Sequence, residues 1–287
     1  MSSSDSGRNL SQLNVGFVGG GNMAYAIAAG LLSKGVLKAS QVIVSATSLI
    51  NLQKRWSNLN VNRFTIDNAE VLRQADVLFL CVKPHILPVC RSSIIAGASG
   101  LDCSHKIMVS ILVGVTLERL NNEFGCLNIP IVRTMPNTPM QVGEGCTIYC
   151  AKFGTTNSTV GERYEEVKFM LNQLGLAFEV KEEQMNGITG LTGCGPAYVY
   201  EIIEALADGG VKQGAAREMA LKMAAQTVMG AAKTVLETGK HPAVLKDEVC
   251  SPGGATIYGV HELEKGAMRA TLINAVERAA ARARELQ

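Results

Sequence analysis

The sequence is short of aromatic side chains and of any charge imbalance. Only 5% of its residues are aromatic, with a single tryptophan, so a core must be built from aliphatic residues and methionine. The net charge is +2, from 27 basic and 25 acidic residues, and no run of Lys or Arg is longer than a pair. This balance argues against a dedicated nucleic-acid-binding protein. Apolar residues are abundant instead, at 47% of 287, enough for one large domain or two ordinary ones.

Cysteine pairs and metal-ligand spacings are also missing. None of the eight cysteines forms a C-x-x-C motif, and the four histidines do not stand at zinc-ligand spacing. The cysteines are scattered through apolar stretches, where a reduced thiol behaves as a small hydrophobic group. We therefore expect free thiols, a cytoplasmic location and no metal site.

The N-terminal region lacks the features of a targeting or membrane-spanning segment. Residues 1–12 have neither the apolar core of a signal peptide nor the Arg-rich pattern of a transit peptide, and we expect them to be flexible. No charge lies between Arg8 and Lys34, a stretch long enough to cross a bilayer. Two asparagines and three consecutive glycines interrupt it, however, and its hydrophobic period changes midway. A strand, a turn and a buried helix explain it better.

The glycines follow a short apolar run at residues 13–18 and precede an Ala-rich helical stretch. Gly19, Gly21 and Ala24 match the G-x-G-x-x-A pattern. In that pattern the first glycine permits a tight turn, the second admits a pyrophosphate, and the alanine allows close packing of helix on strand. The start of the helix then offers free N–H groups to the anion. Because the motif stands directly between a strand and a helix, it indicates a dinucleotide site.

The next predicted strand, residues 41–45, ends without the acid that would hold the ribose 2′-hydroxyl of NAD. Ser45, Ala46, Thr47 and Ser48 follow in its place, with Lys54 and Arg55 nearby. Hydroxyls and N–H groups can accept a 2′-phosphate, so the loop favours NADP(H) over NAD(H). An ordinary polar loop between strand and helix is the alternative.

Further apolar runs alternate with helical stretches, which is typical of a doubly wound parallel sheet. The strands are expected at residues 75–82, 106–112 and 131–133, and the helices at 49–58, 69–74, 86–96 and 117–123. The carboxyl ends of parallel strands share one edge, so the loops that follow them should border a single crevice. Asn68 could reach the same edge. Residues 135–139, Met-Pro-Asn-Thr-Pro, form a rigid loop suited to positioning a ligand, or alternatively a structural turn into a last strand near residues 146–150.

Strand signals vanish from about residue 181 onward. Long Ala- and Met-rich helical stretches are predicted at residues 197–212, 215–236, 255–265 and 268–286. Several are apolar on more than one face, and a helix of that kind must be buried. A domain of this size most easily buries such surface against a partner subunit.

Two glycine-rich turns, residues 190–196 and 250–256, stand out in this half. The second comes just before a helix, so its N–H groups and the helix dipole form a receptor for a small carboxylate. For either turn, a simple helix cap is the alternative.

The chain resembles the pyrroline-5-carboxylate reductase family over almost its whole length. The matching segments, in the family's order, are GFVGGGNMA, ADVLFLCVKPH, RTMPNTP, GLTGCGPAY, EALADGGVKQG and LKDEVCSPGGAT. The last of these is the most specific.

The resemblance implies an α/β protein with an N-terminal Rossmann-type doubly wound parallel sheet, residues 13–180, followed by an all-α dimerisation domain, residues 181–287. It implies reduction of Δ1-pyrroline-5-carboxylate to L-proline with NADPH, NADH being an alternative. It also implies self-association, commonly as a pentamer of dimers, and no membrane or nucleic-acid partner. The implied cofactor residues are Val18, Gly19, Gly20, Gly21, Asn22, Met23, Ser45, Ala46, Ser48, Asn68, Cys81, Val82, Lys83, Pro84, Ile111, Leu112 and Val113. The implied substrate residues are Glu182, Ser251, Gly253, Gly254, Ala255 and Thr256.

The reaction needs little covalent help, since a protonated imine already accepts a hydride readily. We expect the backbone around Gly253 to hold the substrate carboxylate and the Thr256 hydroxyl to bond the ring nitrogen, as the catalytic group. Lys83, at a strand end before a proline, is expected to contact cofactor phosphate. Glu248 stands where many relatives have Asn facing the cofactor, which puts that one contact in doubt.

Two other functions fit parts of the sequence. A β-hydroxyacid dehydrogenase shares the plan of a Rossmann domain followed by helices but uses a helical Lys as acid and base. The helix after Pro196 carries Glu201 and Glu204 in its early turns instead. A non-catalytic NADP(H)-binding protein is the second alternative, and the intact SPGGAT turn argues against it.

Overall fold

The computed structural model describes residues 10–152 and 158–285, and most of the segment expected to be flexible lies outside them. Contacts divide the chain into two units. Met1–Gly193 and Ala279–Gln287 form one, which we call the N-terminal unit. Cys194–Arg278 form the other, which we call the helical unit.

The N-terminal unit is built on an eight-stranded sheet of order β3-β2-β1-β4-β5-β6-β7-β8. The strands are β1 (Val15–Val18), β2 (Val42–Ser45), β3 (Arg63–Thr65), β4 (Val77–Leu80), β5 (Ile107–Ser110), β6 (Ile131–Met135), β7 (Gly145–Ala151) and β8 (Gly175–Glu179). All neighbouring strands are parallel except β6 and β7. The order reverses between β1 and β4, and at such a switch point the loops diverge to leave room for a ligand.

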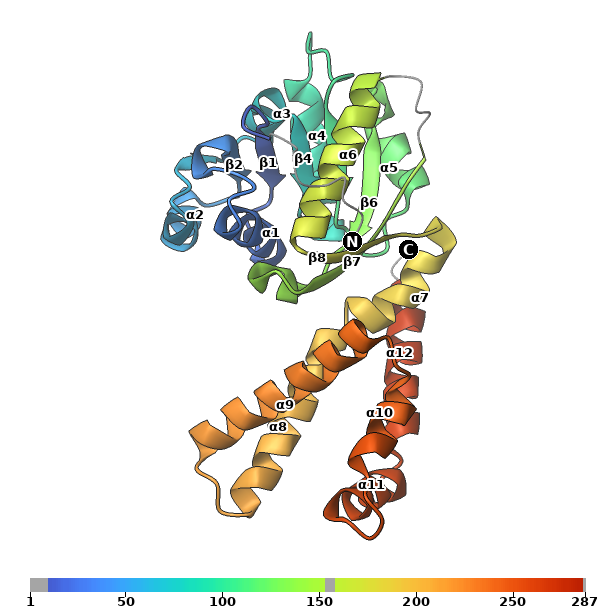
Figure 1. The fold of residues 1–287 in the computed structure, drawn as a ribbon. Helices are drawn as coiled ribbons and strands as arrows, with labels where there is room; N and C mark the ends of the chain where they lie inside the picture. The colour runs from blue at the N-terminus through green and yellow to red at the C-terminus, as the bar shows by residue number, and fades with distance from the viewer. Residues whose placement is uncertain (1–9, 153–157, 286–287) are drawn as a thin grey trace. The chain divides into compact units, whose positions relative to one another are not determined.

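Helices cover both faces of this sheet (Figure 1). On one face α1 (Asn22–Ser33), α2 (Leu49–Trp56) and α6 (Ser158–Gln173) bury apolar side chains against the strands. On the other face lie α3 (Asn68–Gln74), α4 (Leu87–Gly97), α5 (Leu117–Phe124) and α7 (Glu182–Thr192). Every residue of β1, β2, β4 and β5 is buried, because a strand covered on both faces needs a continuous apolar run.

The doubly wound sheet followed by helices confirms the predicted fold class. The elements that the sequence did not reveal are short or weakly patterned. β3 has only three residues, and β8 at the sheet edge is mostly exposed. The sequence analysis also did not predict the helices α6, α7 and α10 (Pro242–Val249). α6 lies in the crossover that connects β7 to the parallel strand β8.

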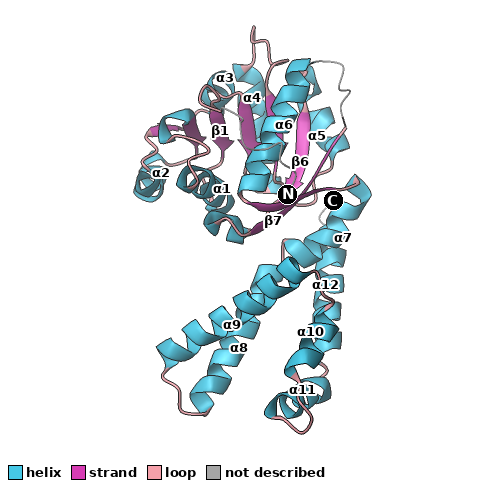
Figure 2. Cartoon of the chain, in the orientation of Figure 1, coloured by secondary structure: helices cyan, strands magenta, loops and turns pink. Residues whose placement is uncertain are grey.

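The helical unit contains α8 (Gly195–Lys212), α9 (Arg217–Thr238), α10 (Pro242–Val249), α11 (Ala255–Lys265) and the first part of α12 (Met268–Glu285) (Figure 2). α8 and α9 lie side by side and meet through the small buried residues Ala207, Ala220 and Ala224. Three buried alanines form only a small hydrophobic core for helices of this length.

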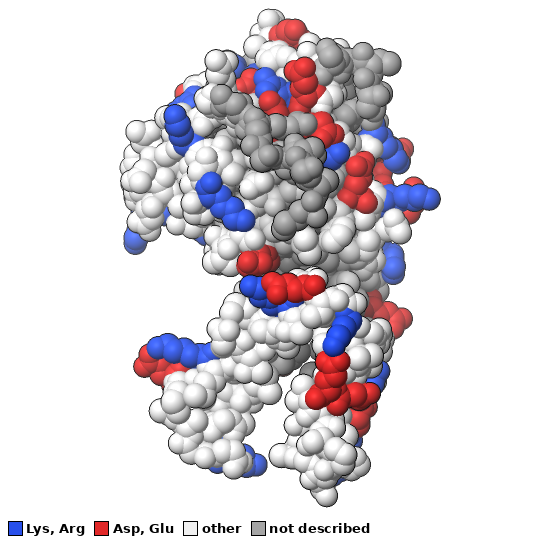
Figure 3. Space-filling view, in the orientation of Figure 1, with Lys and Arg blue, Asp and Glu red and all other residues white. Residues whose placement is uncertain are grey.

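Large apolar side chains of the helical unit are instead exposed. They include Tyr200, Leu206, Met223, Met229, Leu236, Val249, Tyr258, Leu263 and Ile273. The viewed face of this unit accordingly carries few charged side chains (Figure 3). Many exposed large apolar side chains in one unit indicate an interaction face. None of the helices within residues 10–152 and 158–285 is long and apolar enough to cross a membrane.

Candidate functional site

The glycine turn after β1 joins three strand ends. Gly19 has φ +97°, which favours glycine, and a Cβ there would lie 2.8 Å from the carbonyl oxygen of Cys81 after β4. The N–H of Gly19 donates to the carbonyl oxygen of Ser45 at 3.0 Å. The N–H of Cys81 donates to the carbonyl oxygen of Val18 at 2.8 Å. The predicted cofactor residues at the ends of β1, β2 and β4 are therefore brought together at the switch point.

The start of α1 is open where a pyrophosphate would bind. Gly21 is the N-cap residue, and no side chain caps the helix. A Cβ on Gly21 would meet no heavy atom within 4 Å, so nothing from the protein fills the space in front of it. The N–H groups of a first helical turn have no partner within the helix. An uncapped helix start with an unfilled space before it fits a dinucleotide phosphate.

Ser45 and Asn68, both predicted to line the cofactor site, bond to each other. The Ser45 hydroxyl is fully buried and donates to the Asn68 side-chain oxygen at 2.7 Å. The Asn68 amide in turn donates to the Ser93 hydroxyl at 2.9 Å. Both side chains are thereby tied to the protein. Ser48 lies nearer the surface, where its hydroxyl caps α2 by accepting from the N–H of Asn51 at 3.4 Å.

The ends of β4 and β5 complete this edge of the sheet. The N–H of Ile111 donates to the carbonyl of Leu80 at 3.2 Å. Leu112 points into the core, whereas Ile111 and Val113 are half-buried. Cys81, Val82 and Pro84 are also half-buried, and Lys83 is exposed. Burial raises the pKa of the Cys81 thiol well above its ordinary range, so the thiol stays protonated and uncharged where it lines the site.

The Pro-bracketed loop after β6 serves a structural purpose through Asn137. This buried side chain donates from its amide to the carbonyl of Thr192 at 2.9 Å. Its oxygen accepts the N–H of Cys146 at 2.9 Å, at the start of β7. Because both ends of the amide are used within the protein, the structure favours a structural turn into β7 over a ligand contact by this side chain. β7 is not the last strand, however, because β8 follows it.

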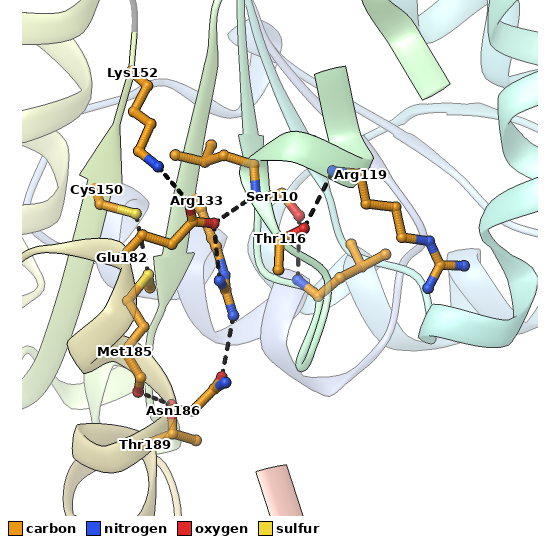
Figure 4. Close-up of polar contacts among 12 residues, drawn as sticks. Ser110, Thr116, Arg119, Arg133, Cys150, Lys152, Glu182, Met185, Asn186 and Thr189 are labelled. Carbon is orange, nitrogen blue, oxygen red and sulfur yellow. Dashed lines mark hydrogen bonds and ion pairs between the residues drawn. The ribbon is translucent and has the colours of Figure 1, made fainter. Parts of the chain in front are cut away.

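Glu182 lies in a polar network of the N-terminal unit (Figure 4). Its carboxylate accepts from the N–H of Leu117 at 2.6 Å and from Arg133 at 3.0 Å. It also pairs with Lys152 at 3.2 Å, and Arg133 donates further to Asn186 at 3.2 Å. Burial alone would raise the pKa of the Glu182 carboxyl, but these donors outweigh burial and hold it below its ordinary value.

This network could not be predicted from the sequence, because its members come from distant segments. Glu182 belongs to the N-terminal unit and the other predicted substrate residues to the helical unit, so a position of Glu182 near the substrate stays a prediction. Within its own unit, Glu182 ties α7 to β6 and to the start of α5.

The SPGGAT turn leads into α11 and leaves the helix start uncapped. Gly253 has φ +68°, and Gly254 is the N-cap residue with no side-chain cap. The N–H of Gly254 closes the turn by donating to the carbonyl of Ser251 at 3.0 Å. A Cβ on Gly254 would lie 2.3 Å from the Ser251 hydroxyl, so a larger residue there would have to displace that side chain. Ala255 and Thr256, the first helical residues, are both exposed.

Thr256 differs from threonines inside the helices of this unit. Thr227, Thr234 and Thr238 donate their hydroxyls to the carbonyl four residues earlier, at 2.7–2.9 Å. For Thr256 the residue at that spacing is Pro252, which lies in the turn before α11. The exposed hydroxyl therefore sits beside uncapped N–H groups, an arrangement that offers both a donor and an acceptor next to an anion receptor.

Glu248 forms an ion pair with Lys240 at 2.6 Å, and both side chains are about half exposed. The negative charge of Glu248 is thus paired within the helical unit.

Comparison with known families matches both halves of the chain. The family described as "Pyrroline-5-carboxylate reductase dimerisation" matches residues 182–286. The family described as "NADP oxidoreductase coenzyme F420-dependent" matches residues 14–114. The first range covers the helical unit, and the second covers the glycine turn and the strand ends of the cofactor site.

Individual relatives match over nearly the full length. The chain is 43% identical to pyrroline-5-carboxylate reductase of Arabidopsis thaliana, covering 95% of each protein. It is 40% identical to human pyrroline-5-carboxylate reductase 2, covering 96% of this chain and 84% of that protein. Among solved structures, Plasmodium falciparum pyrroline carboxylate reductase with NADP bound gives a TM-score of 0.84 at 33% identity, over 97% of this chain and 99% of that one. The Coxiella burnetii pyrroline-5-carboxylate reductase gives 0.81 at 34% identity, over 96% and 98%.

Proposed function

The chain belongs to the pyrroline-5-carboxylate reductase family, and from that premise we propose which of its residues perform the reaction. The protein reduces Δ1-pyrroline-5-carboxylate to L-proline with NADPH. When bound, NADPH supplies a hydride to C5 of the cyclic imine. The residues of this chain must hold the two ligands, orient the imine and provide for the charge on its nitrogen.

The cofactor is held by the edge of the sheet at the switch point. The first turn of α1 receives the pyrophosphate, since Gly21 leaves its N–H groups accessible and no side chain competes for them. The loop from Ala46 to Ser48 accepts the 2′-phosphate through its N–H groups and hydroxyls. The exposed amine of Lys83 contributes a positive charge at the same edge.

The SPGGAT turn holds the substrate. The N–H groups at the start of α11 bind the carboxylate of pyrroline-5-carboxylate, favoured by the helix dipole. The Thr256 hydroxyl then bonds the ring nitrogen and helps to protonate it, directly or through water. The observation that carries this assignment is the uncapped start of α11 with an exposed hydroxyl on its second residue.

Self-association completes the helical unit. The family match to a dimerisation domain and the exposed apolar side chains of α8 and α9 both support association of identical chains. The specific form is a dimer through the helical unit, assembled further into a decamer. We place the protein in the cytoplasm, since all eight cysteines are free thiols and free thiols persist in a reducing compartment.

An assay of NADPH absorbance with single candidate substrates tests this function. In a single-turnover experiment, pyrroline-5-carboxylate should be reduced to proline as NADPH is consumed. Oxidation of a β-hydroxyacid by NADP⁺ in place of imine reduction would favour the dehydrogenase alternative. NADPH binding without turnover of either substrate would favour a non-catalytic role.

A further inference from the structure

The single tryptophan of the chain reaches the glycine turn. Trp56 is the last residue of α2, fully buried, and its indole N–H donates to the carbonyl oxygen of Gly20 at 3.2 Å. The ring is held on two sides, by Phe17 at 5.7 Å and by Tyr25, edge-on, at 5.7 Å. The indole donor therefore has a fixed position beneath the turn that opens toward the cofactor.

Gly20 is what allows this approach. A Cβ at position 20 would lie 2.2 Å from a methyl carbon of Leu52 and 3.3 Å from the indole nitrogen of Trp56. Its φ lies outside the left-handed region, so the glycine is needed for space and not for its backbone conformation. The absent side chain lets α2 lie directly against the turn.

The hydrogen bond also determines where the next N–H points. In a planar trans peptide the carbonyl and the N–H point in opposite directions. Because the Gly20 carbonyl points toward Trp56, the N–H of Gly21 points away from it. That N–H belongs to the residue whose Cβ would meet nothing within 4 Å.

We propose that Trp56 is a positioning residue for the cofactor: its indole N–H holds the Gly20–Gly21 peptide so that the Gly21 N–H faces the pyrophosphate. The inference rests on the proposed binding of the pyrophosphate at the start of α1. Without the indole donor, the peptide is free to rotate, and part of the binding energy is lost in ordering it.

Trp56→Phe tests the hydrogen bond, because it keeps an aromatic ring in the cluster and removes the N–H. The affinity for NADP⁺ should fall about tenfold, since one lost hydrogen bond corresponds to roughly that factor. The affinity for NAD⁺ should fall by the same factor, because both dinucleotides carry the pyrophosphate. The affinity for adenosine 2′-monophosphate, which lacks it, should not change. The KM for pyrroline-5-carboxylate at saturating NADPH should also stay constant.

Phe79→Leu is the matched control. Phe79 stacks on Phe17 at 5.1 Å and belongs to the same aromatic cluster, but the indole donor stays in place. This variant should lower the melting temperature and leave NADP⁺ affinity unchanged. With that result, a loss of packing around Trp56 would not explain a lower NADP⁺ affinity of Trp56→Phe.

A further measurement needs no variant. The single indole N–H gives one NMR signal, which should exchange slowly with solvent and shift on addition of NADP⁺ but not of adenosine 2′-monophosphate. Three results would each overturn the proposal. They are wild-type NADP⁺ affinity in Trp56→Phe, an equal loss of affinity for NADP⁺ and for adenosine 2′-monophosphate in that variant, and a shift of the indole signal caused by adenosine 2′-monophosphate. If Gly21→Val also bound NADP⁺ normally, the pyrophosphate site itself would be wrong. If Gly21→Val lost NADP⁺ binding while the Trp56 tests failed, the pyrophosphate site would stand and only the proposed role of Trp56 would be wrong.

Discussion

The guanidinium of Arg133, which is 1% exposed, is held 3.0 Å from the carboxylate of Glu182 (Figure 4). The two residues come from β6 and from the first position of α7. Arg133 also bonds Asn186, but its Nε has no hydrogen-bond partner among the residues that the structure describes. A buried cation with one donor already unpaired depends strongly on its charged partner, which here is Glu182.

We therefore predict that Glu182→Gln destabilises the N-terminal unit by about 3 kcal/mol, because it leaves the Arg133 charge uncompensated in the interior. Lys152→Ala is the matched control. It removes the other cation on the same carboxylate, but that lysine side chain is 63% exposed. The control should change stability little, since an exposed pair is well solvated. Urea unfolding of the three proteins provides the measurement, and equal losses in both variants would contradict the argument.

The pH dependence of the protein's stability follows from the lowered pKa of the Glu182 carboxyl. A carboxyl whose folded pKa lies below its unfolded value stabilises the protein above the unfolded pKa, near 4.5, and loses that contribution as the pH falls through the folded pKa. The stability gap between wild type and Glu182→Gln should be constant at neutral pH and narrow only below about pH 4.5. A gap that narrowed already near neutral pH would mean that another group sets it.

Features that depend on neighbouring residues could be predicted from the sequence. The glycine turn, the buried strands and the SPGGAT turn before α11 are local patterns, and the structure has them where the sequence indicated. Contacts between distant segments could not be predicted. Arg133 and Glu182 are 49 residues apart, and Trp56 and Gly20 are 36 apart. Their pairing depends on the order of strands in the sheet, which no local spacing encodes.

The same limit applies to side-chain direction. Ser45 and Asn68 lie at the predicted edge of the sheet, but the Ser45 hydroxyl turns inward to Asn68. Asn137 lies in a polar loop that suits a ligand, yet both ends of its amide bond the protein. A polar residue at a strand end can serve either purpose, and only its partners decide which.

The open space before α1 leads to a prediction on Gly21. Gly21→Val should abolish NADPH binding in a fluorescence titration, because the new side chain would occupy the place of the pyrophosphate. The fold should persist, since a Cβ there meets no protein atom within 4 Å. Gly161→Val is the control: this glycine of α6 also has open space around it and should keep NADPH affinity. Normal binding in Gly21→Val would remove the assignment of the pyrophosphate site.

Ser48 offers a way to test recognition of the 2′-phosphate. Ser48→Asp retains a side chain that can cap α2 and adds a negative charge that repels the phosphate. The ratio of kcat/KM for NADPH over NADH should fall by about tenfold, the effect of ~1.4 kcal/mol. Ser48→Asn caps the helix without the charge and should leave the ratio near that of the wild type. If the two variants give the same ratio, the loop does not recognise the 2′-phosphate by charge.

The exposed apolar side chains of the helical unit predict an obligate assembly. Side chains such as Leu236, 69% exposed, and Tyr258, 71% exposed, would face water in an isolated chain. Sedimentation at decreasing concentration, combined with circular dichroism, should reveal no folded monomer, because dissociation would expose this surface. A stable monomer with full activity would contradict the prediction.

Thr256 provides the sharpest test of the chemistry. Thr256→Val keeps the shape of the side chain but removes its donor and acceptor. If the hydroxyl bonds the ring nitrogen, the bond matters most as the imine nitrogen changes charge during hydride transfer. The loss should therefore appear in kcat/KM for pyrroline-5-carboxylate, at roughly 1–3 kcal/mol of transition-state stabilisation.

Two comparisons separate this role of Thr256 from a structural one. NADPH affinity should barely change in Thr256→Val, because the cofactor residues belong to the N-terminal unit, and Thr256→Ser should retain most activity because it keeps the oxygen. The stability of α11 should also be nearly unaffected, since Gly254 is the N-cap residue and no side chain caps the helix. If Thr256→Val reduced the substrate at the wild-type rate, the hydroxyl would have no part in the reaction, and the turn would act through its backbone N–H groups alone.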